Sequence, residues 1–281
     1  MFHLRTMNRK DFPFAVSLAN TMNWNMTISD FEFNMQLEPG GCFLLEVDSE
    51  PVGLATCISF GKVGWFGNLV VNEKYRKQGA GTQLVQHAVN YLKSRGAKTV
   101  GLYAYPQLTN FYGAIGFESE ADFAVLKAGA VFPLGGAKGS IKAIETLDLA
   151  KIINFDEEFF GASRKKLLDL VFRNPSNIGY VVLEGSKTAG FVFSKVFGDA
   201  AEVGPLACLR DEPETAENLL GAVLRRLEGL EAYMYLPTSE SALWGIASKT
   251  GFKEEFRLKR MFFGPALAKN CIYLAESLER G

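Results

Sequence analysis

The pattern of apolar and polar residues predicts a series of strands in the first half of the chain. Apolar runs bounded by glycine or polar residues mark four strands, over 42–47, 53–60, 64–71 and 98–104. A further strand is expected after Gly116-Phe117. The first three strands follow one another without a helix, which predicts an opening meander.

Helical spacing of apolar residues predicts helices between and before these strands. Helices are expected over 11–20, 29–36 and 109–115, the second of them capped by Ser29 or Asp30. The clearest helix covers 79–95 and ends at Gly96. One of its faces carries Leu84, Val85, Ala88, Val89 and Leu92. Strands and helices in this order predict an α/β fold of the α+β kind, a mixed sheet with helices on both faces.

The second half of the chain repeats features of the first. Residues 41–56 read GCFLLEVDSEPVGLAT and residues 179–193 read GYVVLEGSKTAGFVF, each the pattern of a β-hairpin. Gly116-Phe117 likewise matches Gly251-Phe252 at nearly the same spacing. We therefore expect two tandem domains, 1–128 and 141–281, joined by a linker over 129–140. The linker contains GGAKGS, which lacks the G-x-x-x-x-G-K-[ST] spacing of a nucleotide-binding loop.

Composition and charge narrow the class of protein. The 281 residues are 48% hydrophobic and 22% charged, typical of a globular chain. The net charge of -1 gives no electrostatic reason to expect a nucleic-acid or membrane partner. The early Lys10 and Asp11 argue against a signal peptide, and no run reaches the ~18 apolar residues of a membrane span. The four cysteines are far apart and there are only two histidines, so we expect reduced thiols, a cytoplasmic location and no metal site.

The candidate chemistry begins at a strand-to-helix junction. Residues 76–82 read RKQGAGT, directly before the predicted helix. The first amides of a helix lack intrahelical acceptors and carry partial positive charge, and small residues there let an anion approach the backbone. The loop is therefore a candidate phosphate cradle, in which Arg76 and Lys77 add charge and Thr82 a hydroxyl. A tight turn with exposed basic residues is the alternative. A Rossmann site is disfavoured because Leu84 stands where its third glycine belongs.

Two motifs together resemble the GNAT superfamily of acyl-CoA-dependent N-acetyltransferases. Arg76, Gly79 and Gly81 match its [RQ]-x-x-G-x-[GA] signature, and Phe111-Tyr112 followed by Gly116-Phe117 matches its downstream motif. Further matches near Trp24 and after Lys259 resemble a tandem-GNAT subgroup with a diverged second copy. The resemblance implies two tandem GNAT-like domains and acetyl-CoA as co-substrate. It implies that the first domain binds the coenzyme.

The resemblance also implies roles for individual residues. Coenzyme A pyrophosphate would bind at Arg76, Lys77, Gln78, Gly79, Ala80, Gly81 and Thr82. The pantetheine arm would lie in an opening between two strands, bonded to the backbone of Leu69 and Val71, with an N–H near Val70 facing the thioester oxygen. Tyr112 would be the general acid, although a packed aromatic residue is the alternative.

Other expectations concern the acceptor and the second copy. Trp24 and Asn25 would form a wall of the acceptor pocket, with structural packing of Trp24 as the alternative. No general base stands out, because Glu46 and Glu73 have no supporting pattern. The second copy has acidic residues where the glycine loop belongs, so it should not bind coenzyme A. It would either close the acceptor cleft or support the sheet.

Two functions follow from this reading. One is an N-acyltransferase that moves an acetyl group from acetyl-CoA to a primary amine of a small molecule or peptide. The other is a non-catalytic acyl-CoA-binding sensor or scaffold. Turnover with a panel of amines distinguishes them.

Overall fold

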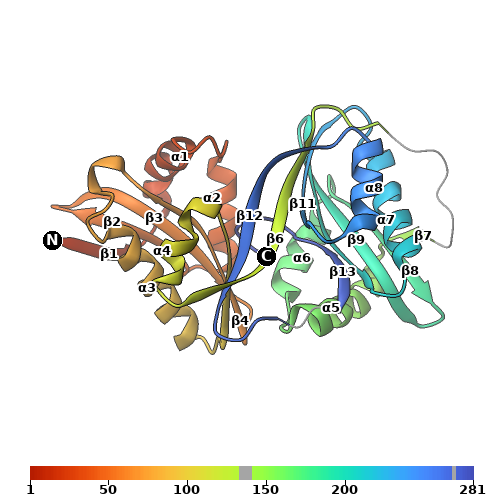
Figure 1. Cartoon of the computed structure of the whole chain (residues 1–281), viewed down its shortest axis with the longest axis horizontal. Coiled ribbons are helices and arrows are strands. Elements are labelled where there is room, and N and C mark those ends of the chain that lie inside the picture. The colour runs from red at the N-terminus through yellow and green to blue at the C-terminus, as the bar shows by residue number, and fades with distance from the viewer. Residues whose placement is uncertain (133–140, 268–269) are drawn as a thin grey trace.

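A computed structural model describes residues 1–132, 141–267 and 270–281 (Figure 1). Most of the expected linker, including GGAKGS, lies outside the described residues, so the domain boundaries at 128 and 141 stay a prediction. Within the described part of the chain, no helix is both long enough and apolar enough to cross a membrane.

The first half contains six strands, four α-helices and short 3-10 turns. Its elements are β1 (Phe2–Thr6), α1 (Phe12–Asn20), α2 (Ile28–Leu37), β2 (Cys42–Val47), β3 (Glu50–Ser59), β4 (Val63–Val71), α3 (Ala80–Ser94), β5 (Thr99–Ala104), α4 (Thr109–Gly113) and β6 (Phe117–Ala128). The predicted strands and helices are confirmed, and β1 is an additional edge strand. The 3-10 turns are Arg9–Asp11, Glu73–Tyr75 and Pro106–Leu108.

The second half repeats this order with four more helices. Its elements are β7 (Ile141–Ala143), α5 (Thr146–Phe160), α6 (Lys165–Arg173), β8 (Ile178–Glu184), β9 (Lys187–Phe197), β10 (Ala200–Leu209), α7 (Pro213–Arg226), β11 (Glu231–Pro237), α8 (Ser241–Lys249), β12 (Lys253–Phe263) and β13 (Cys271–Leu274). The two matched hairpins are β2–β3 and β8–β9, so the tandem repeat is confirmed.

The cap of α2 differs from the prediction. Thr27, and not Ser29 or Asp30, is the N-cap residue. Its backbone N–H donates to the Asp30 carboxylate at 2.7 Å, and its side chain accepts from the Asp30 backbone N–H, which makes a capping box. Asp30 is therefore the third helical residue of that box, and the helix begins at Ile28.

The strands form one continuous mixed sheet in which the two halves exchange strands. The order is β1-β2-β3-β4-β5-β12-β6-β11-β10-β9-β8-β7, with β13 paired to β10. β12 of the second half thus lies between β5 and β6 of the first, and β6 lies between β12 and β11 (Figure 1). This exchange joins the halves through backbone hydrogen bonds.

Helices cover both faces of the sheet, as the sequence predicts. The predicted apolar face of α3 is buried against one side of the first half, whereas α1 and α2 pack against the other side. The α1–α2 side continues into a core shared by the halves, where Trp65 of β4 packs with Phe160 of α5 and Phe262 of β12. Burial of such large aromatic side chains fixes the two halves against each other.

Candidate active site

β4 and β5 are paired only at their amino-terminal ends. Their parallel register runs from Val63–Thr99 to Trp65–Gly101, and no later residue of β4 pairs with β5 in the described parts of the chain. The remaining backbone of β4, up to Val71, therefore presents an edge without a neighbouring strand on the β5 side. This is the divergence that the resemblance implied.

A bulge in β4 accompanies this divergence. Its register with β3 shifts between Leu54 and Thr56, and Asn68 adopts a left-handed backbone conformation with a φ of 51°. The Asn68 Nδ2 donates to Thr56 Oγ1 at 3.1 Å, which stabilises this conformation. A bulge bends a strand and increases its twist, so Leu69 and the residues after it turn toward the loop that starts α3.

The predicted phosphate loop has left-handed residues and leads into an uncapped helix start. Lys77 and Gly79 have φ values of 59° and 86°, and Gly79 is the N-cap of α3 with no side chain capping the helix. The first helical hydrogen bond of the following turn is Gln83 N–H to the Gly79 carbonyl oxygen, at 3.0 Å. The amides of Ala80, Gly81 and Thr82 precede it and have no intrahelical acceptor.

Two of the polar side chains in the loop bind its own backbone. Arg76 Nε donates to the Val71 carbonyl oxygen at 2.9 Å, and Gln78 Nε2 donates to the Lys74 carbonyl oxygen at 2.6 Å. These bonds tie the loop to the end of β4 and shape the turn. The backbone amides at the start of α3 thus remain available as donors at this site.

Tyr112 lies on α4 and is buried among aromatic rings. Only 5% of its surface is exposed. The rings of Phe66, Phe111 and Phe117 meet it edge to face at centroid distances of 6.5, 4.9 and 5.8 Å. Burial raises the pKa of Tyr112 above its ordinary value. Its phenol is therefore protonated at neutral pH, as a proton donor must be, while the packing also matches the alternative structural role.

Trp24 and Asn25 have different environments. Trp24 Nε1 donates to the Tyr105 hydroxyl at 3.2 Å, and the Tyr105 ring packs against Phe256 of β12 with centroids 5.7 Å apart. Trp24 thus bridges the α1–α2 segment to the end of β5. Asn25 is exposed, with a left-handed φ of 53°. The structure places only the tryptophan against the strand end.

The carboxylates considered from sequence are unsuited to act as a base. Arg5 Nε donates to the Glu46 carboxylate at 2.7 Å on the β1–β2 edge, far along the sheet from β5. Glu73 is exposed in the turn after β4.

In the second half, the equivalent opening is filled by the chain itself. β10 and β11 pair in parallel only over Ala200–Val203. Beyond that point β13 pairs with β10, from Leu206–Leu274 to Leu209–Cys271. The next residue, Ala275, donates its N–H to the Tyr235 carbonyl oxygen of β11 at 2.9 Å. β13 thus occupies the place that a pantetheine arm would need.

Residues 276–281, which we call the tail segment, continue from β13 to the first half. Trp65 Nε1 donates to the Leu278 carbonyl oxygen at 3.3 Å. A Cβ on Gly67 would lie 2.5 Å from the Cβ of Glu279. The tail segment therefore covers β4 where its pairing with β5 ends. Sequence reasoning missed it because no local pattern shows which strand a distant segment contacts.

Comparison with known proteins identifies the family of both halves. Residues 4–117 match the sequence model of the acetyltransferase (GNAT) family, and residues 152–274 match that of the acetyltransferase (GNAT) domain. A curated relative, holothin acyltransferase of Pseudoalteromonas sp. (strain SANK 73390), is 25% identical over 262 residues, or 92% of this chain and 87% of the relative.

Solved structures share the whole fold at low identity. A Pyrococcus horikoshii protein described as a candidate acetyltransferase superposes with a TM-score of 0.82 and 22% identity, covering 100% of this chain and 96% of its own. A tandem GNAT protein from the clavulanic acid biosynthesis pathway has a TM-score of 0.64 at 13% identity, covering 95% of this chain and 100% of its own. These likenesses show a shared fold, and the two family matches show that the chain belongs to the GNAT family of acyltransferases and carries two GNAT domains in tandem.

Proposed function

We propose that the protein transfers an acetyl group from acetyl-CoA to a primary amine, using one active site in its first half. The observation that carries this proposal is the uncapped start of α3, with left-handed Lys77 and Gly79, at the end of the diverging strand β4. Three free amides at one helix start suit the pyrophosphate of coenzyme A.

The remaining parts of the coenzyme would follow β4. The pantetheine arm would hydrogen-bond to the backbone of Leu69 and Val71, on the edge that β5 leaves unpaired. The N–H near Val70 would face the thioester oxygen and stabilise negative charge that develops there. Tyr112 would protonate the leaving thiolate, and Trp24 would bound the acceptor while Asn25 marks its outer rim. No metal takes part in this proposal.

The acceptor is proposed to be the amine of a small molecule or a peptide. The chain length of the transferred acyl group needs a direct test. The curated relative is named an acyltransferase without an acyl chain length. Acetyl-CoA and longer acyl-CoAs should therefore be compared with the same panel of amines.

The test combines calorimetry with release of free thiol. We expect acetyl-CoA to bind and thiol release to depend on an added amine. Tyr112→Phe should leave the Kd for the coenzyme unchanged and lower kcat by on the order of 100-fold. The matched control is Tyr180→Phe in β8 of the second half, which should change neither value. Coenzyme binding without turnover on any amine would instead indicate the sensor.

A further inference from the structure

The tail segment brings charged side chains of the second half to the acceptor side of β4. Glu279 lies on Gly67, one residue before the bulge at Asn68. The Trp65 ring, two residues earlier, contacts Gly281. The segment therefore covers the face of β4 that carries Trp65, which is the α1–α2 face and lies opposite α3.

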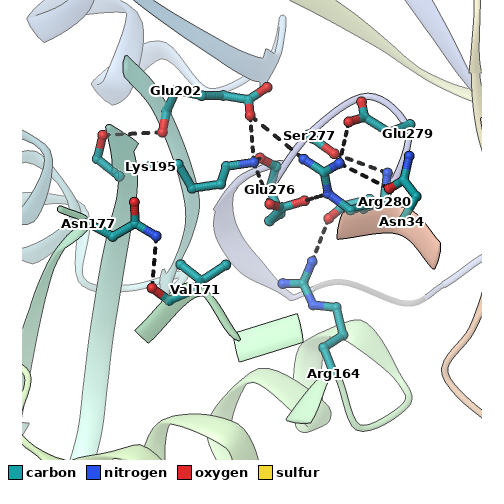
Figure 2. A network of polar contacts seen from close by, with 12 residues as sticks. Asn34, Arg164, Val171, Asn177, Lys195, Glu202, Glu276, Ser277, Glu279 and Arg280 are labelled. Carbon is teal, nitrogen blue, oxygen red and sulfur yellow. Dashed lines mark hydrogen bonds and ion pairs between the residues drawn. The ribbon is translucent and has the colours of Figure 1, made fainter. Parts of the chain in front are cut away.

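Arg280 is the centre of a buried polar network in this segment (Figure 2). Its Nε lies 2.9 Å from Glu276 Oε2, and its Nη2 lies 3.9 Å from Glu202 Oε2. Lys195 pairs with both of these carboxylates. The remaining nitrogen, Nη1, contacts Glu279 Oε1 and donates to Asn34 Oδ1 at 3.3 Å.

The two glutamates of the tail segment have opposite environments. Burial alone would raise the pKa of Glu276, but Arg280 and Lys195 outweigh it and hold the pKa at about 2. Its side chain is 0% exposed, and the lowered pKa keeps it charged at neutral pH, which suits a structural group. The Glu279 side chain keeps 21% of its surface exposed, and Arg280 is its one hydrogen-bond donor within the described residues.

Burial raises the pKa of Glu279, and the nearby Glu202 and Glu276 add to the effect against the attraction of Arg280 and Lys195. A carboxylate whose pKa is raised toward neutrality is a better proton acceptor than an ordinary one. The pKa values of Glu276 and Glu279 are thus shifted in opposite directions. Such a pair is typical of sites in which one carboxylate is structural and the other takes part in proton transfer.

Asn34 of α2 adds a second, independent sign of a ligand. Its side chain is 1% exposed, and its Nδ2 has no acceptor within the described residues. A buried donor without an acceptor is costly unless something binds it. Because Nη1 of Arg280 holds both Asn34 Oδ1 and Glu279 Oε1, the free Nδ2 and Oε2 flank the same guanidinium. They offer one donor and one acceptor to a bound molecule.

We propose that Glu279 of the tail segment is the general base for the site in the first half, and that the acceptor is a primary amine with a nearby oxygen that Asn34 Nδ2 binds. This inference rests on the proposed function. The second half then contributes a catalytic residue to the first, which explains why a copy without a coenzyme site accompanies it.

The proton and electron balance of the step is complete with these groups. The acceptor enters as an ammonium ion, and the Glu279 carboxylate takes one proton. The neutral nitrogen attacks the thioester carbonyl carbon, so that a C–N bond forms, and collapse of the adduct breaks the C–S bond. The thiolate takes the Tyr112 proton, and the second proton from nitrogen replaces it through water. Glu279 releases its proton to solvent, which leaves an amide, a thiol and one proton.

The test is Glu279→Gln, which keeps the length of the side chain and an oxygen for Arg280. We expect kcat/KM to fall on the order of 100-fold or more, with an unchanged Kd for acetyl-CoA. The wild type should lose activity as Glu279 is protonated at low pH, and the variant should lack this acid limb. Glu254→Gln is the matched control, because it removes a carboxylate that pairs with Arg257 at the surface.

A second variant keeps the proposal falsifiable if the first fails to fold. Glu279→Asp should retain the acid limb with a lower kcat, since the carboxylate is withdrawn by one methylene. Asn34→Ala should raise KM for an oxygen-bearing amine more than for a simple alkylamine. Wild-type kcat and pH profile in Glu279→Gln overturn the proposal, and so does an undiminished kcat in Glu279→Asp if only that variant folds. A wild type that binds the coenzyme but acetylates no amine would refute the proposed function instead.

Discussion

Leu206 of β10 pairs with Leu274 of β13, at the position where β4 of the first half has no strand beside it. The two halves share one fold, yet one opening is closed by the chain's own backbone and the other is not. A pantetheine arm binds as an added strand would, so β13 and a coenzyme would compete for the same edge. This supports the proposal that the first half alone binds a coenzyme.

The first prediction is that each chain binds one coenzyme A, and that Gly79 controls its affinity. Gly79 has a φ of 86°, and among the described residues none apart from its chain neighbours has an atom within 4 Å of the position that a Cβ would take. Phosphate oxygens are proposed to lie in this space. Gly79→Ala should weaken coenzyme binding at least tenfold. Titration calorimetry should give a stoichiometry of one for the wild type.

The control for this prediction is Gly96→Ala at the other end of α3. Gly96 has a similar φ of 95° and also has open space around it. Both substitutions place alanine in a left-handed conformation, at a cost of about 1–2 kcal/mol in stability. Only Gly79→Ala should alter the Kd. Equal affinity in the two variants would contradict the cradle.

The local features of the site could be predicted from the sequence, and α3 shows why. The spacing of its apolar face, from Leu84 to Leu92, and the glycine after it are properties of neighbouring residues, and all were confirmed. The loop before it is equally local. Its left-handed glycine follows from a short motif, because few other residues adopt that conformation at low cost.

The non-local features could not be predicted. Nothing in the sequence of β12, Lys253–Phe263, shows that this strand lies between two strands of the other half. Glu279 is similar, since its neighbour Gly67 is more than 200 positions earlier in the chain. Contacts of this kind depend on strand order, which hydrophobic spacing does not encode. The proposed base, Glu279, was therefore absent from the prediction, while the proposed acid, Tyr112, was present.

The second prediction tests the strand that closes the second opening. Gly204 has a φ of 150°, and a Cβ there would overlap the Ala275 carbonyl oxygen. The backbone of β10 or of Ala275 must move to make room for this Cβ. Gly204→Ala should therefore lower the free energy of unfolding by about 1–3 kcal/mol, the cost of a strained backbone position. Urea denaturation measures the change.

Gly245→Ala is the matched control for Gly204→Ala. Gly245 lies within α8, and outside its own helix backbone and chain neighbours no described residue has an atom within 4 Å of an added Cβ. Alanine is favoured over glycine in a helix by about 1 kcal/mol, so this variant should be unchanged or more stable. If Gly204→Ala were as stable as the wild type, the close contact between β10 and the residue after β13 would be refuted.

The third prediction concerns the buried pair of Arg164 and Asp156. Arg164 Nε and Nη2 donate to the two Asp156 oxygens at 2.9 and 2.6 Å, and Arg164 also donates to the Gly281 carbonyl oxygen. Both side chains are almost fully buried. Arg164→Met should lower the free energy of unfolding by about 3–5 kcal/mol, because it leaves a buried carboxylate without its partner.

A double variant distinguishes two effects, the loss of the Arg164–Asp156 ion pair and the cost of burying the Asp156 carboxylate without a partner. Arg164→Met with Asp156→Leu should be less destabilised than Arg164→Met alone, since no buried charge then remains. Arg257→Met removes an exposed arginine from its pair with Glu254 and should cost about 1 kcal/mol or less. Strict additivity of the two single variants at Arg164 and Asp156 would contradict a direct interaction.

The last prediction is a loss of stability in acid that depends on Glu276. Its pKa is lowered from 4.5 to about 2 in the folded chain, because Arg280 and Lys195 outweigh the effect of burial. A carboxylate with a lowered pKa stabilises the fold fully above its unfolded pKa, and this contribution disappears as the pH falls through its folded pKa. The free energy of unfolding should therefore decline between pH 4.5 and pH 2.

Urea denaturation between pH 6 and pH 3 checks this decline. Glu276→Gln is less stable at pH 6, because Arg280 and Lys195 lose a charged partner, but it has no carboxylate to titrate at this position. Its stability should therefore fall less between pH 6 and pH 3 than that of the wild type. Glu255→Gln, which removes an exposed carboxylate of β12, should retain the wild-type decline. Parallel curves for wild type and Glu276→Gln would show that the buried network does not hold Glu276 in its charged form.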